Sequence, residues 1–133
     1  MDVARISRWL VSVALMACLM SVAAAHGMLI RSHPPADSEI AQLPETIRLS
    51  FSERVESRFS RVTVHRALRD AETGELEPQE RVDAGMAESA AITQELAVRL
   101  PASLPAGLYL IEWQVLSIDS HRTTGRFTLT YTP

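Results

Sequence analysis

The sequence predicts an all-β domain, on two observations. Apolar and polar residues alternate with period two along much of the chain beyond residue 25, which is typical of strands with one buried face. Short stretches rich in Pro, Gly, Asp and Ser separate these runs, as turns do. Short alternating strands with this punctuation indicate a Greek-key β-sandwich or barrel of about seven strands, immunoglobulin-like or cupredoxin-like in arrangement.

The expected strands follow in chain order. A short first strand ends at the turn HPPADS, and a second turn, PASLPAG, introduces the longest run. The predicted strands cover residues 28–32, 46–52 (TIRLSFS), 61–65 (RVTVH), 96–100 (LAVRL), 108–117 (LYLIEWQVLS) and 126–131 (RFTLTY). Residues 69–91 are acidic and poorly patterned, so they are expected to form a long loop with a turn near Gly74, one edge strand and a helical turn near 84–91.

Residues 1–25 are expected to be a secretory signal peptide. Arg5 and Arg8 precede an uncharged apolar run of 17 residues, and Ala23 and Ala25 supply the small residues that signal peptidase requires. The predicted domain organisation is therefore a signal peptide, 1–25, followed by one β domain, 26–133.

Two other fates of this segment stay open. The apolar run could be a membrane anchor, although a spanning helix needs roughly 20 residues. The stretch LMAC also loosely resembles a lipoprotein signal, which would make Cys18 a lipidated N-terminus. That route would leave the apolar LMSVAAA where a polar tether is expected.

Cleavage after Ala25 would leave 108 residues without cysteine or lysine. The new α-amine would then be the one aliphatic amine of the protein. With 11 arginines and 15 acidic residues, the net charge of this part is −4. A mildly acidic chain without a basic stripe argues against nucleic acid as a partner.

Four histidines lie beyond residue 25, and two of them are weak candidates. His65 falls on the polar face of a strand, and His33 precedes two prolines in a turn, where it could serve as an accessory group. His121 is a stronger candidate ligand, because Asp119 lies two residues before it and an extended chain would point both side chains to one side. The alternative is an Asp-turn with an exposed histidine.

His26 strengthens the case that Asp119 and His121 belong to a metal site. A histidine at a free N-terminus offers its α-amine and an imidazole nitrogen, which together close a chelate ring on a metal. Adding Asp119 and His121 gives three nitrogens and one oxygen, a set that suits Cu(II) in a tetragonal plane. Zn(II) would accept the same donors tetrahedrally. Only Met28 and Met86 would survive cleavage, so a dedicated Cu(I) site is not expected.

Several motifs resemble the periplasmic copper-binding CopC family. They are the P-A-D turn, L-x-F-S-E, and G-x-Y-x-x-x-W-x-V-x-S-x-D-x-H with the glycine that follows it. The resemblance implies a small Greek-key β domain that binds Cu(II) through the mature N-terminal histidine and the D-x-H pair, here His26, Asp119 and His121. It also implies a monomeric periplasmic protein for copper sequestration, delivery or resistance, with an inner-membrane copper permease of the CopD type as a partner.

The chain departs from the family pattern at two places. Arg122 stands where members often have a proline after the second histidine, which adds positive charge beside the proposed cation. The methionine-rich Cu(I) segment of some members is missing, so the resemblance implies a variant that binds Cu(II) alone.

Two alternative functions stay in view. Copper held by an N-terminal histidine also occurs in oxidative polysaccharide-cleaving enzymes, but those need an open coordination position and often an aromatic substrate face. Only six aromatic residues follow residue 25, and four of them are expected in the core. No enzyme activity is therefore expected. The other alternative, a metal-free envelope adaptor, has no support beyond the fold pattern.

Overall fold

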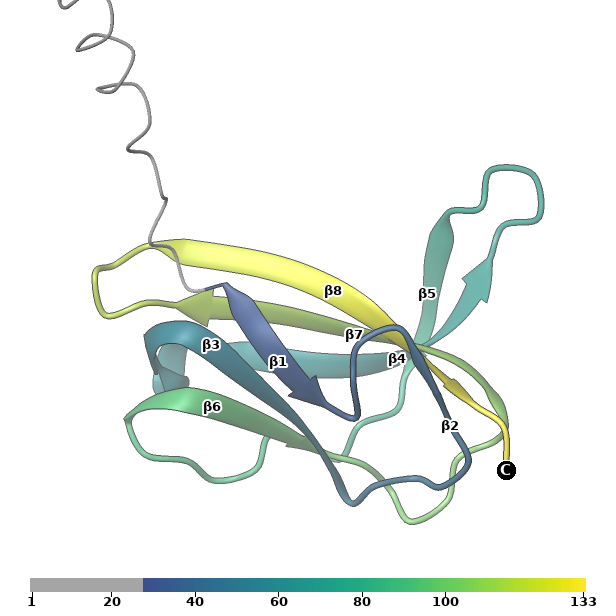
Figure 1. The fold of residues 1–133 in the computed structure, drawn as a ribbon, viewed down its shortest axis with the longest axis horizontal. Helices are drawn as coiled ribbons and strands as arrows, with labels where there is room; N and C mark the ends of the chain where they lie inside the picture. The colour runs from purple at the N-terminus through teal and green to yellow at the C-terminus, as the bar shows by residue number, and fades with distance from the viewer. Residues whose placement is uncertain (1–27) are drawn as a thin grey trace, which may run out of the picture.

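The computed structural model describes residues 28–133, which form two β-sheets packed face to face (Figure 1). The elements in chain order are β1 (Leu29–His33), β2 (Ser38–Ile40), β3 (Thr46–Glu56), the 3-10 helix η2 (Ser57–Phe59), β4 (Arg61–Arg69), β5 (Leu76–Arg81), β6 (Ile92–Arg99), β7 (Gly107–Leu116) and β8 (Arg122–Tyr131). Within these residues there is no helix with the length and apolar character that a membrane crossing requires.

The strands divide into a three-stranded and a five-stranded sheet. The smaller sheet has the order β1-β3-β6, and the larger one has the order β2-β8-β7-β4-β5. Neighbouring strands are antiparallel except for β2 and β8, which run parallel. This arrangement confirms the predicted β-sandwich, with eight strands where about seven were expected.

The core lies between the two sheets and is built from the alternating faces that the sequence predicts. Fourteen buried side chains form it: Ile47, Leu49, Phe51, Val55, Val62, Val64, Leu96, Val98, Tyr109, Ile111, Trp113, Val115, Phe127 and Leu129. Phe51 and Trp113 meet edge to face across it, with ring centroids 5.3 Å apart. Because the described residues include no cysteine, this apolar contact holds the domain together without disulfides.

The P-A-D turn lies where the chain passes from the small sheet to the large one. Asp37 adopts a left-handed conformation (φ 58°), and its carboxylate accepts hydrogen bonds from Thr128 N at 3.0 Å and Thr128 Oγ1 at 3.2 Å. Its own N–H donates to the Thr128 carbonyl oxygen at 2.8 Å. The motif therefore fixes β2 against β8.

Residues 69–91 hold the predicted edge strand, β5, and the predicted turn at Gly74 (φ 72°), but the helical turn expected near 84–91 is wrong. That stretch instead runs beside β6, where Ala87 N donates to Ala97 O and Arg99 N donates to Gly85 O. The half-buried Met86 packs against the core, and Val62 N donates to its sulfur at 3.2 Å. Tertiary contacts outweigh the weak helical preference here.

Gly125 gives Trp113 the space that it needs. The two residues face each other in the β7–β8 register, and a Cβ added at Gly125 would lie 2.3 Å from Trp113 Cζ2. No real contact is that short, so the indole must lie over a residue without a side chain.

We expect Gly125→Ala to displace the Trp113 ring and to lower the free energy of unfolding by about 1–3 kcal/mol, as overpacked core substitutions do. Urea unfolding and near-ultraviolet circular dichroism measure the two effects. Thr124→Ala, at the exposed neighbouring position, is the matched control and should change little. A Gly125→Ala protein with native stability and an unaltered tryptophan signal would contradict this account.

Asp83 lies in the segment between β5 and β6 and holds that segment against β4 of the large sheet. Its side chain is fully buried, and its carboxylate accepts hydrogen bonds from Val64 N at 2.9 Å, Gly85 N at 3.0 Å and the Arg81 guanidinium at 2.9 Å. Burial by itself raises the pKa of Asp83, but these hydrogen bonds together outweigh it and bring the pKa below its usual value.

A carboxylate with a lowered pKa in the folded state stabilises the fold above its unfolded pKa of ~3.9, and this contribution is lost as the pH falls through the folded value. We therefore expect Asp83→Asn to cost about 1.5–3 kcal/mol at neutral pH, the range for hydrogen bonds to charged groups. The difference from the unaltered protein should shrink below about pH 4. Urea unfolding at several pH values checks this, and a difference independent of pH would contradict it.

Candidate metal centre

The turn between β7 and β8 presents the predicted D-x-H pair. Ser120 takes a left-handed conformation (φ 72°) and donates its N–H to Ser117 O at 2.9 Å, while Ser117 N donates to His121 O at 2.9 Å. These bonds close a tight turn, so the pair does not lie on the extended chain that the sequence argument assumed. The side chains meet because the backbone folds back on itself.

The side chains of Asp119 and His121 contact each other within this turn. Asp119 Oδ2 lies 3.0 Å from His121 Nδ1, and Asp119 Oδ1 accepts a hydrogen bond from His121 N at 3.1 Å. This backbone hydrogen bond is the one expected in an Asp-turn, so the Asp-turn and the contact between the two side chains occur together. Both side chains are exposed, 41% for Asp119 and 60% for His121, and Nδ1 is the ring nitrogen that faces Asp119.

This turn and the start of the described chain are anchored on the same segment of β3. Ile118 N donates to Arg54 O at 3.1 Å, and two residues earlier in β3 Ser52 N donates to Met28 O at 2.8 Å. Met28 N in turn donates to Ser52 Oγ at 3.0 Å. In Figure 1 the β7–β8 turn and the beginning of β1 lie at the same end of the sandwich.

The third predicted donor residue, His26, lies outside the described residues. It precedes Met28 by two residues, a distance of at most about 7 Å along an extended chain. Within residues 28–133, no three His, Asp, Glu or Cys side chains are grouped closely enough to hold a metal ion. Of the three predicted ligand residues, the described part of the chain brings together Asp119 and His121, which are too few to hold a metal ion by themselves.

The other two histidines lie elsewhere. His33 ends β1 and faces Arg48 of β3, five residues and about 16 Å of strand away from Met28. His65 lies in β4, with Nδ1 3.3 Å from the carbonyl oxygen of Gln79 in β5. His33 is thus not placed as an accessory group to the D-x-H pair, and His65 is half-buried against the β5 hairpin rather than fully solvated.

Glu53 is a candidate polar or cation-binding residue that the sequence analysis did not identify. It lies in β3 between Ser52 and Arg54, the two anchoring residues, and its Oε2 is buried without a hydrogen-bond donor among the described residues. Leaving a buried carboxylate oxygen unpaired is costly, so a donor or cation at this point would be stabilised. In the sequence, Glu53 is the last residue of the L-x-F-S-E motif. The motif by itself does not show whether this glutamate binds a cation or only supports the fold.

Comparison of the sequence with known proteins indicates the same family as the sequence motifs. The CopC domain family model matches residues 29–132. Protein YobA of Escherichia coli K12 is 32% identical over 104 residues, which cover 78% of this chain and 77% of YobA. Copper resistance protein C of Escherichia coli is 33% identical over 110 residues, which cover 81% of this chain and 82% of that protein.

The fold is also similar to that of solved structures of copper resistance proteins. The crystal structure of PcoC, a methionine-rich copper resistance protein from Escherichia coli, superimposes with a TM-score of 0.62 at 33% identity and covers 81% of this chain and all of PcoC. The family match spans nearly every described residue, including β3, β7 and the turn that carries Asp119 and His121. The resemblance seen in the sequence motifs is thereby confirmed, and the chain belongs to the CopC family.

Proposed function

We propose that this protein binds Cu(II) in the periplasm and sequesters or delivers it in copper homeostasis or resistance. Membership of the CopC family and the name of the relative copper resistance protein C support copper as its cargo. The observation that carries the proposal is the Asp119–His121 pair, exposed on a turn that shares its β3 anchor with the start of β1.

In this proposal signal peptidase cuts after Ala25 and thereby creates the site. The new N-terminal His26 supplies its α-amine and an imidazole nitrogen, His121 supplies a third nitrogen, and Asp119 supplies an oxygen and offsets the charge of the cation. The short chain distance between His26 and Met28 supports this assignment, because Met28 is anchored beside the segment that holds the turn. An uncleaved chain would lack the amine.

Three nitrogens and one carboxylate oxygen favour Cu(II) over the other divalent first-row metals, which follows the general order of affinity. Thioether ligands would be needed for a dedicated Cu(I) site, and the sequence beyond residue 25 holds only Met28 and Met86. Met86 is committed to the core, where its sulfur accepts a hydrogen bond from Val62 N. This differs from PcoC, which is described as methionine-rich.

We propose a binding role rather than an enzymatic one. The four aromatic side chains expected in the core are buried there: Phe51, Tyr109, Trp113 and Phe127. They are therefore not available to form a substrate face next to the turn. A carboxylate in the coordination plane would also fill a position that oxidative chemistry needs open.

We expect His121→Ala to weaken Cu(II) binding by more than the roughly 10–100-fold typical for loss of a residue that only supports a ligand. Titration calorimetry gives the affinity, and electron paramagnetic resonance should show nitrogen coupling from several donors that decreases in the variant. His33→Ala is the matched control, because it removes an exposed histidine at the other end of β1. Unaltered binding by His121→Ala, or a spectrum without nitrogen coupling, would exclude the proposed site.

The absence of lysine allows a selective test of the amine. Acetylation of the processed protein should add one acetyl group to an aliphatic amine, weaken Cu(II) binding strongly, and be slowed by bound Cu(II). An acetylated amine becomes an amide nitrogen, which does not donate a lone pair as an amine does. Intact mass before and after the reaction measures both the cleavage point and the modification.

The control for this test is the same reaction on the His121→Ala protein, whose amine should react but gain less protection from Cu(II). A mass that places the N-terminus at Cys18 with a lipid attached would overturn cleavage after Ala25. Full Cu(II) affinity after acetylation would show that the amine is not a ligand.

A further inference from the structure

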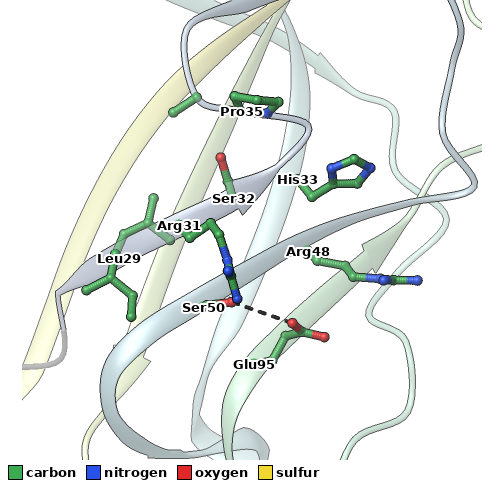
Figure 2. Close-up of a pocket in the computed structure, with 10 residues that line it drawn as sticks. Leu29, Arg31, Ser32, His33, Pro35, Arg48, Ser50 and Glu95 are labelled. Carbon is green, nitrogen blue, oxygen red and sulfur yellow. Dashed lines mark hydrogen bonds between the residues drawn. The ribbon is translucent and has the colours of Figure 1, made fainter.

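The outer face of the small sheet carries a groove that the proposed metal site does not use. Its volume is about 710 Å³, and its lining includes β1 together with Arg48, Ser50 and Glu95 of β3 and β6 (Figure 2). In the β1–β3 register Arg31 lies opposite Ser50 and His33 lies opposite Arg48, so these side chains share one face. The large sheet packs against the other face of this sheet, and no described strand covers the groove.

The groove is positively charged, although the chain as a whole has a net charge of −3. Arg31, His33 and Arg48 line it together with one acidic residue, Glu95, whose carboxylate accepts a 3.5 Å hydrogen bond from Ser50. Neither Arg31 nor Arg48 forms an ion pair with another of the described residues. The groove is therefore suited to an element that brings carboxylates onto the outer face, over β1 and β3.

The β4–β5 hairpin carries the opposite charge and projects from the sandwich (Figure 1). Residues 69–77 contain four acidic residues and one arginine. The side chains of Glu72, Glu75 and Glu77 are exposed, and none of them forms an ion pair within the described part of the chain. The hairpin therefore offers three carboxylates that are free to meet a cationic surface.

Hydrogen bonds fix the tip of this hairpin. The Asp70 carboxylate accepts hydrogen bonds from Glu72 N at 2.8 Å and Thr73 N at 2.7 Å, and Gly74 N donates to Asp70 O at 2.9 Å. Arg69 Nη1 donates to Gly74 O at 2.9 Å, which commits this arginine to the tip. The acidic projection is thus ordered before it contacts anything, and docking it costs little conformational entropy.

The hairpin lies away from the groove of its own molecule. β4 and β5 belong to the large sheet, whereas the groove is on the outer face of the small sheet, with the core between the two sheets. In Figure 1 the hairpin extends away from β1 and β3. A groove and a projection of opposite charge on different parts of one chain are suited to a heterologous contact between two copies.

We propose that the groove over β1 and β3 receives the β4–β5 hairpin of a second copy of this chain, with Glu72 and Glu75 directed at Arg31 and Arg48. Arginine suits this contact because its planar guanidinium binds a carboxylate through two parallel hydrogen bonds. A hairpin tip buries less area than a stable interface needs, so the association is weak, with a dissociation constant on the order of 0.1–1 mM. The proposal does not depend on which metal the protein carries.

Sedimentation of the processed protein measures this contact, in the presence of a chelator that removes any association bridged by metal. We expect the average mass to rise between roughly 10 µM and about 1 mM protein, and to rise less when salt is added. The groove variant, Arg31→Glu with Arg48→Glu, should raise the dissociation constant about tenfold or more. The hairpin variant, Glu72→Arg with Glu75→Arg, should do the same.

Mixing the two variants tests whether groove and hairpin meet each other. The groove variant has an acidic groove and an acidic hairpin, and the hairpin variant has a basic groove and a basic hairpin, so neither should associate alone. In a mixture each groove finds a hairpin of opposite charge, and association should return. Arg61→Glu with Arg126→Glu, which reverses two exposed arginines of the large sheet, is the matched control and should associate as the unaltered protein does.

Three results would overturn the proposal. They are a mass that stays at the monomer value up to about 1 mM, association that persists unchanged in either variant, and a mixture that associates no better than its components. Amide chemical shifts should move with concentration in β1 and in residues 70–77, and shifts confined to other segments would assign the contact to another surface. Arg31→Gln with Arg48→Gln repeats the test without charge reversal, should the groove variant fold poorly. Cu(II) affinity, measured on the same variants, should not change, which separates this proposal from the metal site.

Discussion

The hydrogen bonds made by residues 52–55 of β3 are the constraint on which the site depends. On one side of this segment Ser52 bonds to Met28, and on the other Arg54 bonds to Ile118, with a further bridge between Val55 and Ser117. Two segments some ninety residues apart in the chain are thereby held by one strand. This strand therefore holds the start of β1 and the β7–β8 turn at the same end of the sandwich.

The sandwich makes this segment rigid enough to serve as such a support. Phe51, which precedes this segment, and Val55, its last residue, are buried in the core, and Phe51 packs edge to face on Trp113 of β7. β7 then continues into the turn that carries Asp119 and His121. The polar groups of the site are exposed, while the backbone beneath them is fixed by apolar packing, and little ordering would remain to be done when a cation binds.

The small sheet has one apolar face and one polar face because side chains alternate along its strands. Alternation points Leu49 and Phe51 into the core, while Arg48 and Ser50 line the outer groove beside the edge strand β1. The groove and the D-x-H turn are therefore separate features that share β3, one along its outer face and one at its end.

By itself the sequence determined the β-sandwich, most of its strands, the core faces and the family, because a period of two and local turn chemistry are written in neighbouring residues. Only the tertiary structure decided what depends on distant partners. The stretch near 84–91 lost its predicted helical turn to pairing with β6, and Asp119 met His121 through a tight turn rather than an extended strand. The positions of His33 and Glu53 likewise follow from strand register, which no local pattern specifies.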